Sequence, residues 1–147
     1  AKSAGCRPDL ILNSVGSDLR IGNKNLKYGY GYGGPCFPRD NRAFALYAGD
    51  VNINAVISKA SDEANQLHLQ YQVEEFMKNN DQSKHIVFSG LSYKTGTTII
   101  EESQKLTLAV ELARKGYRIV IQDDQEVVNR IKANYGDLFE YQDKKEY

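Results

Sequence analysis

The stretch HIVFSGLSYKTGTTIIEESQKLTLAVELARKGYRIVIQD, residues 85–123, decides the fold class. It opens with a short apolar run that reaches Gly90 and closes with a second one, YRIVIQD at 117–123. Between them, SQKLTLAVELARKG at 103–116 has the apolar period of an amphipathic helix, with Gly116 as its stop signal. Short apolar runs that flank a helix are typical of strands buried in a parallel sheet. The stretch therefore predicts a βαβ unit.

The same alternation continues toward the C-terminus. EVVNRIKANYG at 126–136 has a helical pattern that ends in glycine, and DLFEY at 137–141 can start a third strand. This order predicts right-handed βαβ units and a Rossmann-like parallel sheet, so the expected fold class is α/β. We expect the sheet to be partial, because the chain ends in QDKKEY where further strands would follow, as in a piece of a larger protein.

Helical patterns dominate the first half of the chain. PDLILNSVG at 8–16 and PRDNRAFALYAG at 38–49 each begin with proline and end with glycine. VNINAVISKASDEANQLHLQYQVEEFMKNN at 51–80 predicts a helix of more than roughly 35 Å if it is continuous. Its apolar period runs through Ile53, Val56, Ile57, Ala60, Ala64, Leu67, Tyr71 and Phe76. Such a helix connects domains or lines a subunit interface, unless it is an ordinary surface helix with frayed ends. We expect a central helical region at 1–80 and an α/β domain at 81–147.

The composition excludes several classes of partner. The 19 basic and 19 acidic side chains balance to zero, which argues against general binding to nucleic acid or to a membrane surface. No apolar run approaches the roughly 20 residues that span a bilayer, and AKSAGCRPDL lacks the apolar core of a signal peptide. Cys6 and Cys36 are expected to be free thiols, and no CxxC or HxxxH spacing indicates a metal site. We expect a cytoplasmic protein that binds neither nucleic acid nor membrane.

The tract KYGYGYGGPCFPRD, residues 27–40, admits three interpretations. Its glycines match the dinucleotide fingerprint G-x-G-x-x-G, which requires a buried strand directly before it. The preceding segment RIGNKNLK is too charged for a central strand, and Pro35 follows the last glycine, so this match is weak. A second interpretation is a stripe of core tyrosines, because the alternation places all three on one side of an extended chain.

The third interpretation is a nucleophile site. Cys36 lies just before a predicted helix start with Arg39 nearby, and both features favour the reactive thiolate. Gly33 and Gly34 carry no side chains, so a substrate could approach the backbone closely. Asp40 could orient a water or shuttle a proton. The residues alone leave two alternatives open: Cys36 as a small buried apolar residue, and Asp40 as an acid that complements the helix dipole.

Two motifs together resemble a known family. RIGNKNLKYGYGYGGPCFPRD at 20–40 resembles the active-site segment of the UDP-glucose/GDP-mannose dehydrogenases, which reads Gly-Gly-x-Cys-Phe-x-Lys/Arg-Asp after a glycine/aromatic loop. FSGLSYKTGTTIIEES at 88–103 resembles the Gly-hydrophobic-Ser/Ala-aromatic-Lys segment that opens the UDP-binding domain of the family. The order of the motifs, with a long helix between them, makes the pair far more specific than either alone. The similarity runs from about Ser3 to about Asp124.

The resemblance implies a chemistry for the cysteine tract. Members of this family oxidise the primary alcohol of a nucleotide sugar to a carboxylate and pass hydrides to two NAD molecules in turn. Their cysteine adds to the intermediate aldehyde as a thiohemiacetal and then carries a thioester that water hydrolyses. By resemblance, Cys36 is this nucleophile, Asp40 positions the water and handles protons, and Arg39 faces the nicotinamide cofactor.

The resemblance also implies a set of residues that bind a UDP-sugar. Residues 27–33 would form the loop under the sugar nucleotide, Arg20 would reach it in a neighbouring subunit, and Tyr93 with Lys94 would lie at its UDP end. The expected set is Arg20, Lys27, Tyr28, Gly29, Tyr30, Gly31, Tyr32, Gly33, Tyr93 and Lys94. A homodimer through the central helices is expected for the same reason.

The chain departs from the family pattern in two respects. Where the family commonly has Arg-Glu-Ser, this chain has Glu101-Glu102-Ser103, which reverses a charge expected to contact NAD. The residues also lack the N-terminal Rossmann domain of the family, which would bind most of the NAD. We expect part of an enzyme that oxidises UDP-glucose to UDP-glucuronate and that is inactive as this piece alone. The alternatives are another nucleotide sugar, a binding module without catalysis, and an unrelated α/β domain whose motif match is chance.

Overall fold

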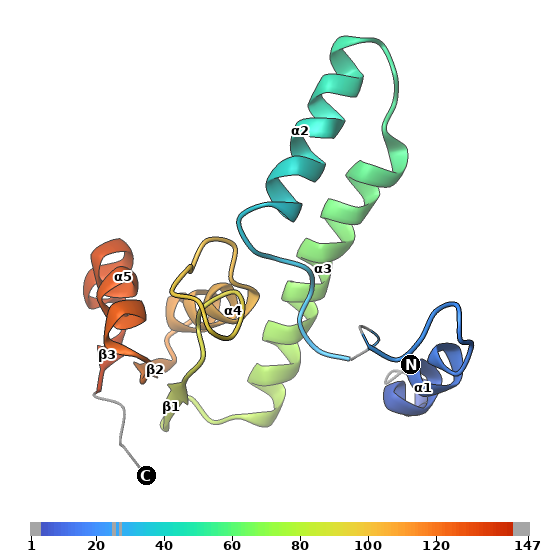
Figure 1. Ribbon diagram of the computed structural model, residues 1–147. Coiled ribbons are helices and arrows are strands. Elements are labelled where there is room, and N and C mark those ends of the chain that lie inside the picture. Colours follow the sequence, from blue (N-terminus) through green and yellow to red (C-terminus); the bar gives the residue numbers. More distant parts are fainter. Residues whose placement is uncertain (1–3, 25, 27, 143–147) are drawn as a thin grey trace. The chain divides into compact units, whose positions relative to one another are not determined.

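The computed structural model describes residues 4–24, 26 and 28–142 of the 147-residue chain (Figure 1). The chain divides into two compact units, Ala1–Tyr30 and Gly31–Tyr147. The first unit holds helix α1 (Pro8–Gly16), which begins with the predicted proline in its first turn and confirms the predicted bounds. A Cβ on Gly16 would lie 1.8 Å from Asn23 Oδ1, so glycine lets the chain after α1 fold back against the end of the helix.

The second unit begins with two long helices, α2 (Phe37–Asp50) and α3 (Val56–Asn79), which pack against each other as a hairpin (Figure 1). At about 1.5 Å per residue, the 24 residues of α3 extend about 36 Å. The predicted start of α3 at residue 51 is wrong. Asn52 adopts a left-handed φ of 59°, and the N–H of Ile53 donates to the oxygen of Ala48 at 2.7 Å, so these residues form the turn of the hairpin.

The buried side of α3 differs from the predicted apolar side over most of the helix and matches it only near the end, where Phe76 packs against the core. Val56 and Ile57 are 60% and 83% exposed, and Leu67 is exposed as well. The helix turns Ser58 and Val73 inward instead. Ser58 Oγ donates to the main-chain oxygen of Asn41 at 2.8 Å. The start of α3 is therefore held against α2 by a polar contact.

The rest of the second unit is a small α/β domain. Strands β1 (His85–Phe88), β2 (Arg118–Ile121) and β3 (Glu140–Tyr141) form a sheet in the order β1-β2-β3, with both pairings parallel. Helix α4 (Gln104–Arg114) joins β1 to β2, and α5 (Gln125–Tyr135) leads through a short 3-10 helix, η2 (Gly136–Leu138), to β3. This arrangement confirms the α/β fold class with parallel βαβ connections. The third strand is shorter than predicted, because η2 occupies its first residues.

The two predicted strands of the βαβ unit differ in burial. β2 lies in the middle of the sheet and is buried from Ile119 to Ile121, as its apolar run predicts. β1 was expected to be buried too, but it lies at an edge and alternates, with Val87 55% exposed and Phe88 buried.

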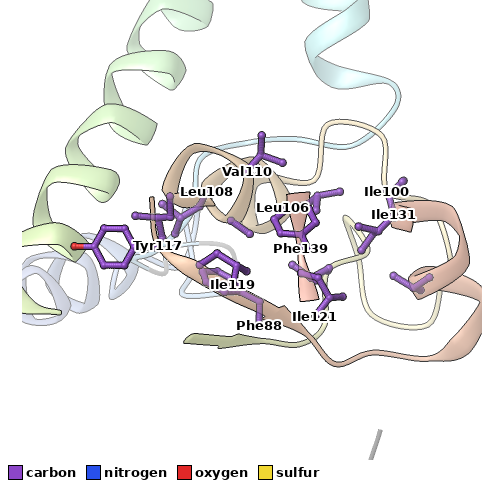
Figure 2. Close-up of a cluster of buried hydrophobic side chains, with 14 of the residues drawn as sticks. Phe88, Ile100, Leu106, Leu108, Val110, Tyr117, Ile119, Ile121, Ile131 and Phe139 are labelled. Atoms are coloured by element: carbon purple, nitrogen blue, oxygen red, sulfur yellow. The ribbon is translucent and has the colours of Figure 1, made fainter. Parts of the chain in front are cut away.

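One hydrophobic core holds this domain together (Figure 2). Leu106 and Leu112 of α4 are almost fully buried against Ile121 and the other sheet residues. Each such side chain contributes about 1.5–3 kcal/mol relative to exposure. Val73 of α3 belongs to the same cluster, so the second half of α3 is part of the α/β core. The long helix is thereby fixed to the domain that follows it.

Candidate active site

The predicted nucleophile lies at the start of a helix. Cys36 is the residue directly before α2, its thiol is free, and the residue is exposed. Pro38 occupies the first turn and is buried, and the N–H of Asp40 donates to the oxygen of Cys36 at 2.8 Å. The exposed N–H groups and the dipole of the first turn favour a negative charge at this position. The structure thus places Cys36 directly before α2, where the sequence predicts the start of a helix.

Arg39 and Asp40 pair with each other beside this thiol. Arg39 Nε donates to Asp40 Oδ1 at 2.8 Å, and both side chains are mostly exposed. The hydrogen bond to Asp40 raises the pKa of Arg39, and the charges of Asp40 and Cys36 act in the same direction. The three residues thus share one electrostatic environment at the N-terminus of α2, but the guanidinium is committed to the carboxylate.

Three glycines of the tract make room for protein atoms. A Cβ on Gly31 would lie 2.0 Å from Asn65 Oδ1 of α3, and one on Gly33 would lie 2.3 Å from the oxygen of Glu102. Gly34 has a φ of +88°, and its Cβ would lie 2.5 Å from a ring carbon of Tyr93. The missing side chains thus let the tract pack against α3 and against the segment after β1. Gly29, in the first unit, has open space beside it.

The tyrosines of the tract differ in their surroundings. Tyr28 and Tyr30, in the first unit, are 48% and 47% exposed, which speaks against a stripe of core tyrosines. Tyr32 is half-buried in the second unit, and Asn65 Nδ2 donates to its main-chain oxygen at 2.8 Å. Burial raises the pKa of the Tyr32 phenol, and the negative charge of Asp62 adds to this effect.

The second motif forms the segment between β1 and α4. The N–H of Tyr93 donates to the oxygen of Ile99 at 2.9 Å, which closes this segment into a loop. The side chains of Ser92 and Thr97 each donate to the oxygen of Lys94 at 3.0 Å. Lys94 is exposed, and the ring of Tyr93 lies against Gly34. The structure therefore joins the two motifs, which are far apart in the sequence, at one place.

Asp123 anchors this loop, and sequence reasoning missed it. Asp123 is 8% exposed; its Oδ2 accepts the N–H of Leu91 at 2.6 Å and its Oδ1 accepts the N–H of Asp124 at 2.8 Å. Lys105 Nζ donates to the oxygen of Ser89 at the start of the same loop. An acidic residue two positions after a buried parallel strand is a signal that could have revealed this position.

Three further charged residues meet in an arrangement that sequence reasoning missed. Arg42 of α2 pairs with Asp62 of α3 through Nε–Oδ1 at 3.0 Å and with Glu102 through Nη1–Oε1 at 2.7 Å. Glu102 adopts a left-handed φ of 51°. Its main-chain oxygen accepts the N–H of Gly34 at 3.1 Å. No sequence spacing connects these residues, which meet only in the folded chain.

The predicted site residues fall into two groups. The second unit brings Gly31, Tyr32, Gly33, Cys36, Arg39 and Asp40 into one segment, which touches Tyr93 in the loop that also holds Lys94. The first unit holds Arg20, Tyr28, Gly29 and Tyr30. Arg20 pairs there with Asp18, through Nε–Oδ1 at 3.0 Å, and its side chain is 89% exposed. Lys27 lies outside the described residues.

The described residues provide neither a cluster of metal ligands nor a membrane-spanning helix. Within residues 4–24, 26 and 28–142, no group of three or more histidine, cysteine, aspartate or glutamate side chains is placed to hold a metal ion. The helices in that part of the chain include none that is both long and apolar enough to cross a bilayer.

Comparison with known proteins identifies relatives of both halves of the chain. Residues 1–67 match the profile of the central domain of the UDP-glucose/GDP-mannose dehydrogenase family. A UDP-glucose 6-dehydrogenase of Pseudomonas aeruginosa is 32% identical over 116 residues, which cover 77% of this chain and 26% of the relative. A GDP-mannose 6-dehydrogenase of Pseudomonas putida is 28% identical over 142 residues, which cover 95% of this chain and 32% of the relative. The chain therefore spans about a quarter to a third of the length of these relatives.

Solved structures show the same likeness. A UDP-glucose dehydrogenase from the archaeon Pyrobaculum islandicum is 30% identical with a TM-score of 0.77, over 90% of this chain and 31% of that one. A GDP-mannose dehydrogenase from Pseudomonas aeruginosa shares the fold. It is 24% identical with a TM-score of 0.68, over 97% of this chain and 35% of that one.

Proposed function

Because the chain belongs to the UDP-glucose/GDP-mannose dehydrogenase family, we propose that it forms part of an NAD-dependent enzyme that oxidises UDP-glucose to UDP-glucuronate. Relatives named as UDP-glucose 6-dehydrogenases, at 31% and 32% identity, support this substrate. A second nucleotide sugar, GDP-mannose, is the alternative, because a GDP-mannose 6-dehydrogenase aligns over 95% of the chain. We further propose that residues 1–80 belong to a central helical region and residues 81–147 to a UDP-binding domain.

The observation that carries the proposal is the contact between the two motifs. Cys36 is an exposed thiol at the N-terminus of α2, two residues after the glycine that packs on Tyr93. A sugar that lies at this thiol would therefore have the loop after β1, with Tyr93 and Lys94, within the same site. Lys94 is exposed, and an ammonium group there can pair with a diphosphate.

In the proposed reaction, Cys36 acts on the aldehyde that the first oxidation produces. Its thiolate forms a C–S bond to the aldehyde carbon, and the oxygen takes a proton to give a thiohemiacetal. After the second oxidation this adduct is a thioester. Water then adds to the carbonyl carbon, the C–S bond breaks, and the thiolate leaves as the carboxylate forms. Asp40, paired with Arg39 beside the thiol, would position this water and accept its proton.

The two oxidations require a hydride acceptor, and NAD is proposed for both. The described residues do not themselves fit a dinucleotide site. The loop after β1 begins SGLSYK and lacks the G-x-G-x-x-G fingerprint, and Asp123, the acidic residue after β2, accepts the N–H of Leu91 within the protein. Dinucleotide folds leave the corresponding acid free for the ribose. Arg39 is the one described residue proposed to face the cofactor, so neither hydride transfer is assigned to side chains of this chain.

The remaining predicted residues are proposed to bind the sugar nucleotide. The exposed tyrosines Tyr28 and Tyr30 offer aromatic faces, Gly29 leaves open space, and Arg20 has a mostly exposed guanidinium. We propose that the tract residues Lys27, Tyr28, Gly29, Tyr30, Gly31, Tyr32 and Gly33 contact the UDP-sugar, and that Arg20 contacts the UDP-sugar of a neighbouring subunit.

A homodimer through the central helices is the proposed assembly. The hairpin of α2 and α3 exposes Phe44, Leu46, Tyr47, Val56 and Ile57, each at least 60% exposed. Large exposed apolar surfaces mark protein interfaces. A second copy of the chain would cover this apolar surface. The proposed location is the cytoplasm, where reducing conditions keep both thiols free.

Cysteine labelling tests the proposed function. The chain is treated with a small amount of iodoacetamide, with and without UDP-glucose, and the labelling of each cysteine is followed by mass spectrometry. We expect Cys36 to react faster than Cys6, because it lies at a helix N-terminus, and we expect UDP-glucose to protect Cys36 alone. GDP-mannose in a parallel sample distinguishes the two sugars.

Equal labelling of the two cysteines, with no protection by either nucleotide sugar, would contradict the proposal and favour an interaction module. An absorbance assay for NADH with UDP-glucose and NAD complements this experiment. We expect the 147-residue chain alone to give no steady turnover, because its described residues contain no dinucleotide site.

A further inference from the structure

Arg42 connects three parts of the second unit. It lies on α2, in the helix turn after Cys36 and Asp40, and it reaches Asp62 on α3 and Glu102 in the loop before α4. Nε donates to Asp62 at 3.0 Å and Nη1 donates to Glu102 at 2.7 Å. The guanidinium presents its N–H donors in a rigid planar fork, so Nε and Nη1 can donate to two different carboxylates at once. Arg42 is also only partly exposed, so the pairs are less screened than a fully exposed surface salt bridge.

The partner Glu102 holds the cysteine segment through its backbone. Its φ of 51° is a left-handed conformation, which a residue with a side chain adopts only when its surroundings hold it there. This conformation aims the main-chain oxygen at the N–H of Gly34, 3.1 Å away. The same oxygen would lie 2.3 Å from a Cβ on Gly33, so the two chain segments pass in close contact. Cys36 follows two residues after Gly34.

We infer that Arg42 is a positioning residue for Cys36. It fixes the side chain of Glu102, which keeps the backbone of Glu102 in the conformation that holds Gly34 and thereby the thiol. Asp62 aligns the guanidinium from the other side, and Gln66 Nε2 donates to the second oxygen of Asp62 at 3.1 Å. This role rests on the proposed function only in that Cys36 is the nucleophile; the connection from Arg42 to Gly34 does not depend on it.

The inference is tested by hydrogen exchange of the Gly34 amide, followed by NMR in the full 147-residue chain. Loss of a partly exposed ion pair weakens local stability by up to about 1 kcal/mol. We therefore expect Arg42→Met to speed exchange at Gly34 by about two- to fivefold, since about 1.4 kcal/mol corresponds to tenfold. In Arg42→Lys, the Gly34 amide should exchange at a rate between those of the parent chain and Arg42→Met, because one ammonium cannot reproduce the planar fork of the guanidinium. Arg114→Met, which breaks a similar Arg–Glu pair on α4, is the matched control and should leave Gly34 unchanged.

A double-mutant cycle separates positioning from a merely structural role. If Arg42 acts through Glu102, the variant Arg42→Met/Glu102→Gln should exchange at Gly34 no faster than Arg42→Met alone. Additive effects of the two changes would overturn the inference. So would an equal acceleration of the amides throughout α2 and α3, because Arg42 would then only hold the two helices together through Asp62.

Labelling of Cys36 with iodoacetamide distinguishes failure of this inference from failure of the proposed function. In the parent chain, absence of protection by UDP-glucose counts against the proposed function alone. Where UDP-glucose does protect the parent chain, we expect Arg42→Met to need a severalfold higher UDP-glucose concentration for half protection, with the labelling of Cys6 unchanged. Protection identical to that of the parent, together with unchanged exchange at Gly34, would refute the role of Arg42.

Discussion

Replacement of Gly34 by alanine tests the contact that joins the two motifs. Two penalties follow from the structure. The backbone has a φ of +88°, which costs a residue with a Cβ about 1–2 kcal/mol. The new methyl group would also lie 2.5 Å from a ring carbon of Tyr93. Because Tyr93 is 38% exposed, its ring can move aside, and overpacking of this kind costs about 1–3 kcal/mol.

A matched control isolates the contact with Tyr93. Gly116 has a φ of +91°, and a Cβ added there would meet nothing within 4 Å, so Gly116→Ala carries the backbone penalty alone. Both variants also gain about 0.4–1 kcal/mol from the reduced entropy of the unfolded chain, and this gain cancels in the comparison. We expect the free energy of unfolding in urea to fall by about 1–3 kcal/mol more for Gly34→Ala than for Gly116→Ala.

A second substitution completes the experiment. Tyr93→Ala removes the ring, so Gly34→Ala should cost no more than Gly116→Ala when it is introduced into the Tyr93→Ala background. The reasoning is refuted if Gly34→Ala and Gly116→Ala destabilise the parent chain equally. It is also refuted if the loss of the Tyr93 ring leaves the cost of Gly34→Ala unchanged.

Three further predictions rest on single residues. Asp123→Asn keeps one acceptor oxygen for the two N–H groups, of Leu91 and Asp124, that Asp123 accepts. It should lower the free energy of unfolding in urea by about 1–3 kcal/mol, and an unchanged urea midpoint would contradict this. Burial raises the pKa of the Tyr32 phenol in the folded chain above its ordinary value of 10.0. The buried neutral phenol therefore contributes its full stability below pH 10, and this stability is lost as the pH rises through the folded-state pKa. Thermal unfolding should therefore show a steeper loss of stability above about pH 10 in the parent chain than in Tyr32→Phe, and parallel curves would refute it. Ile57→Glu should shift sedimentation from dimer to monomer, because Ile57 is 83% exposed on the apolar surface proposed to bind a second copy; a monomeric parent chain would remove the basis for the dimer.

The helices and strands were predictable because each carries a local signal. The stop signal at Gly116 and the apolar run of β2 depend only on neighbouring residues, and the structure places α4 and β2 as predicted. The start of α3 was not predictable in this way. The segment from residue 51 continues the apolar period of the helix, but the left-handed turn at Asn52 belongs to the packing of α2 on α3.

The candidate site was predictable only in part for the same reason. The position of Cys36 at a helix start follows from Pro38 two residues later, which is a local signal. The pairing of Arg42 with Glu102 joins residues 60 positions apart, and no period or spacing in the sequence indicates it. The glycines were interpreted as space for a substrate, whereas Gly33 and Gly34 face protein atoms that only the folded chain brings near.

Helix α3 explains why the sequence pattern indicated the wrong face. Its inward positions follow a helical spacing, and they are Ser58, Asp62, Asn65, Leu69, Val73 and Phe76. The first three bind Asn41, Arg42 and the main-chain oxygen of Tyr32, and the last three pack in the α/β core. One face thus changes from polar to apolar along the helix. A search for a single apolar stripe therefore finds the exposed side over most of α3 and meets the buried face only at Phe76.

The consequence for the site is that a single rigid element determines the position of the cysteine segment. The polar half of α3 holds the segment that begins at Gly31 through Asn65, and the apolar half is anchored beside the sheet through Val73. The loop with Tyr93 is anchored to the same sheet through Asp123. Both motifs are therefore attached to elements of the same α/β domain. The apolar side chains that remain exposed on the other face of α3 do not contribute to this core, which leaves them available for contact with a second copy.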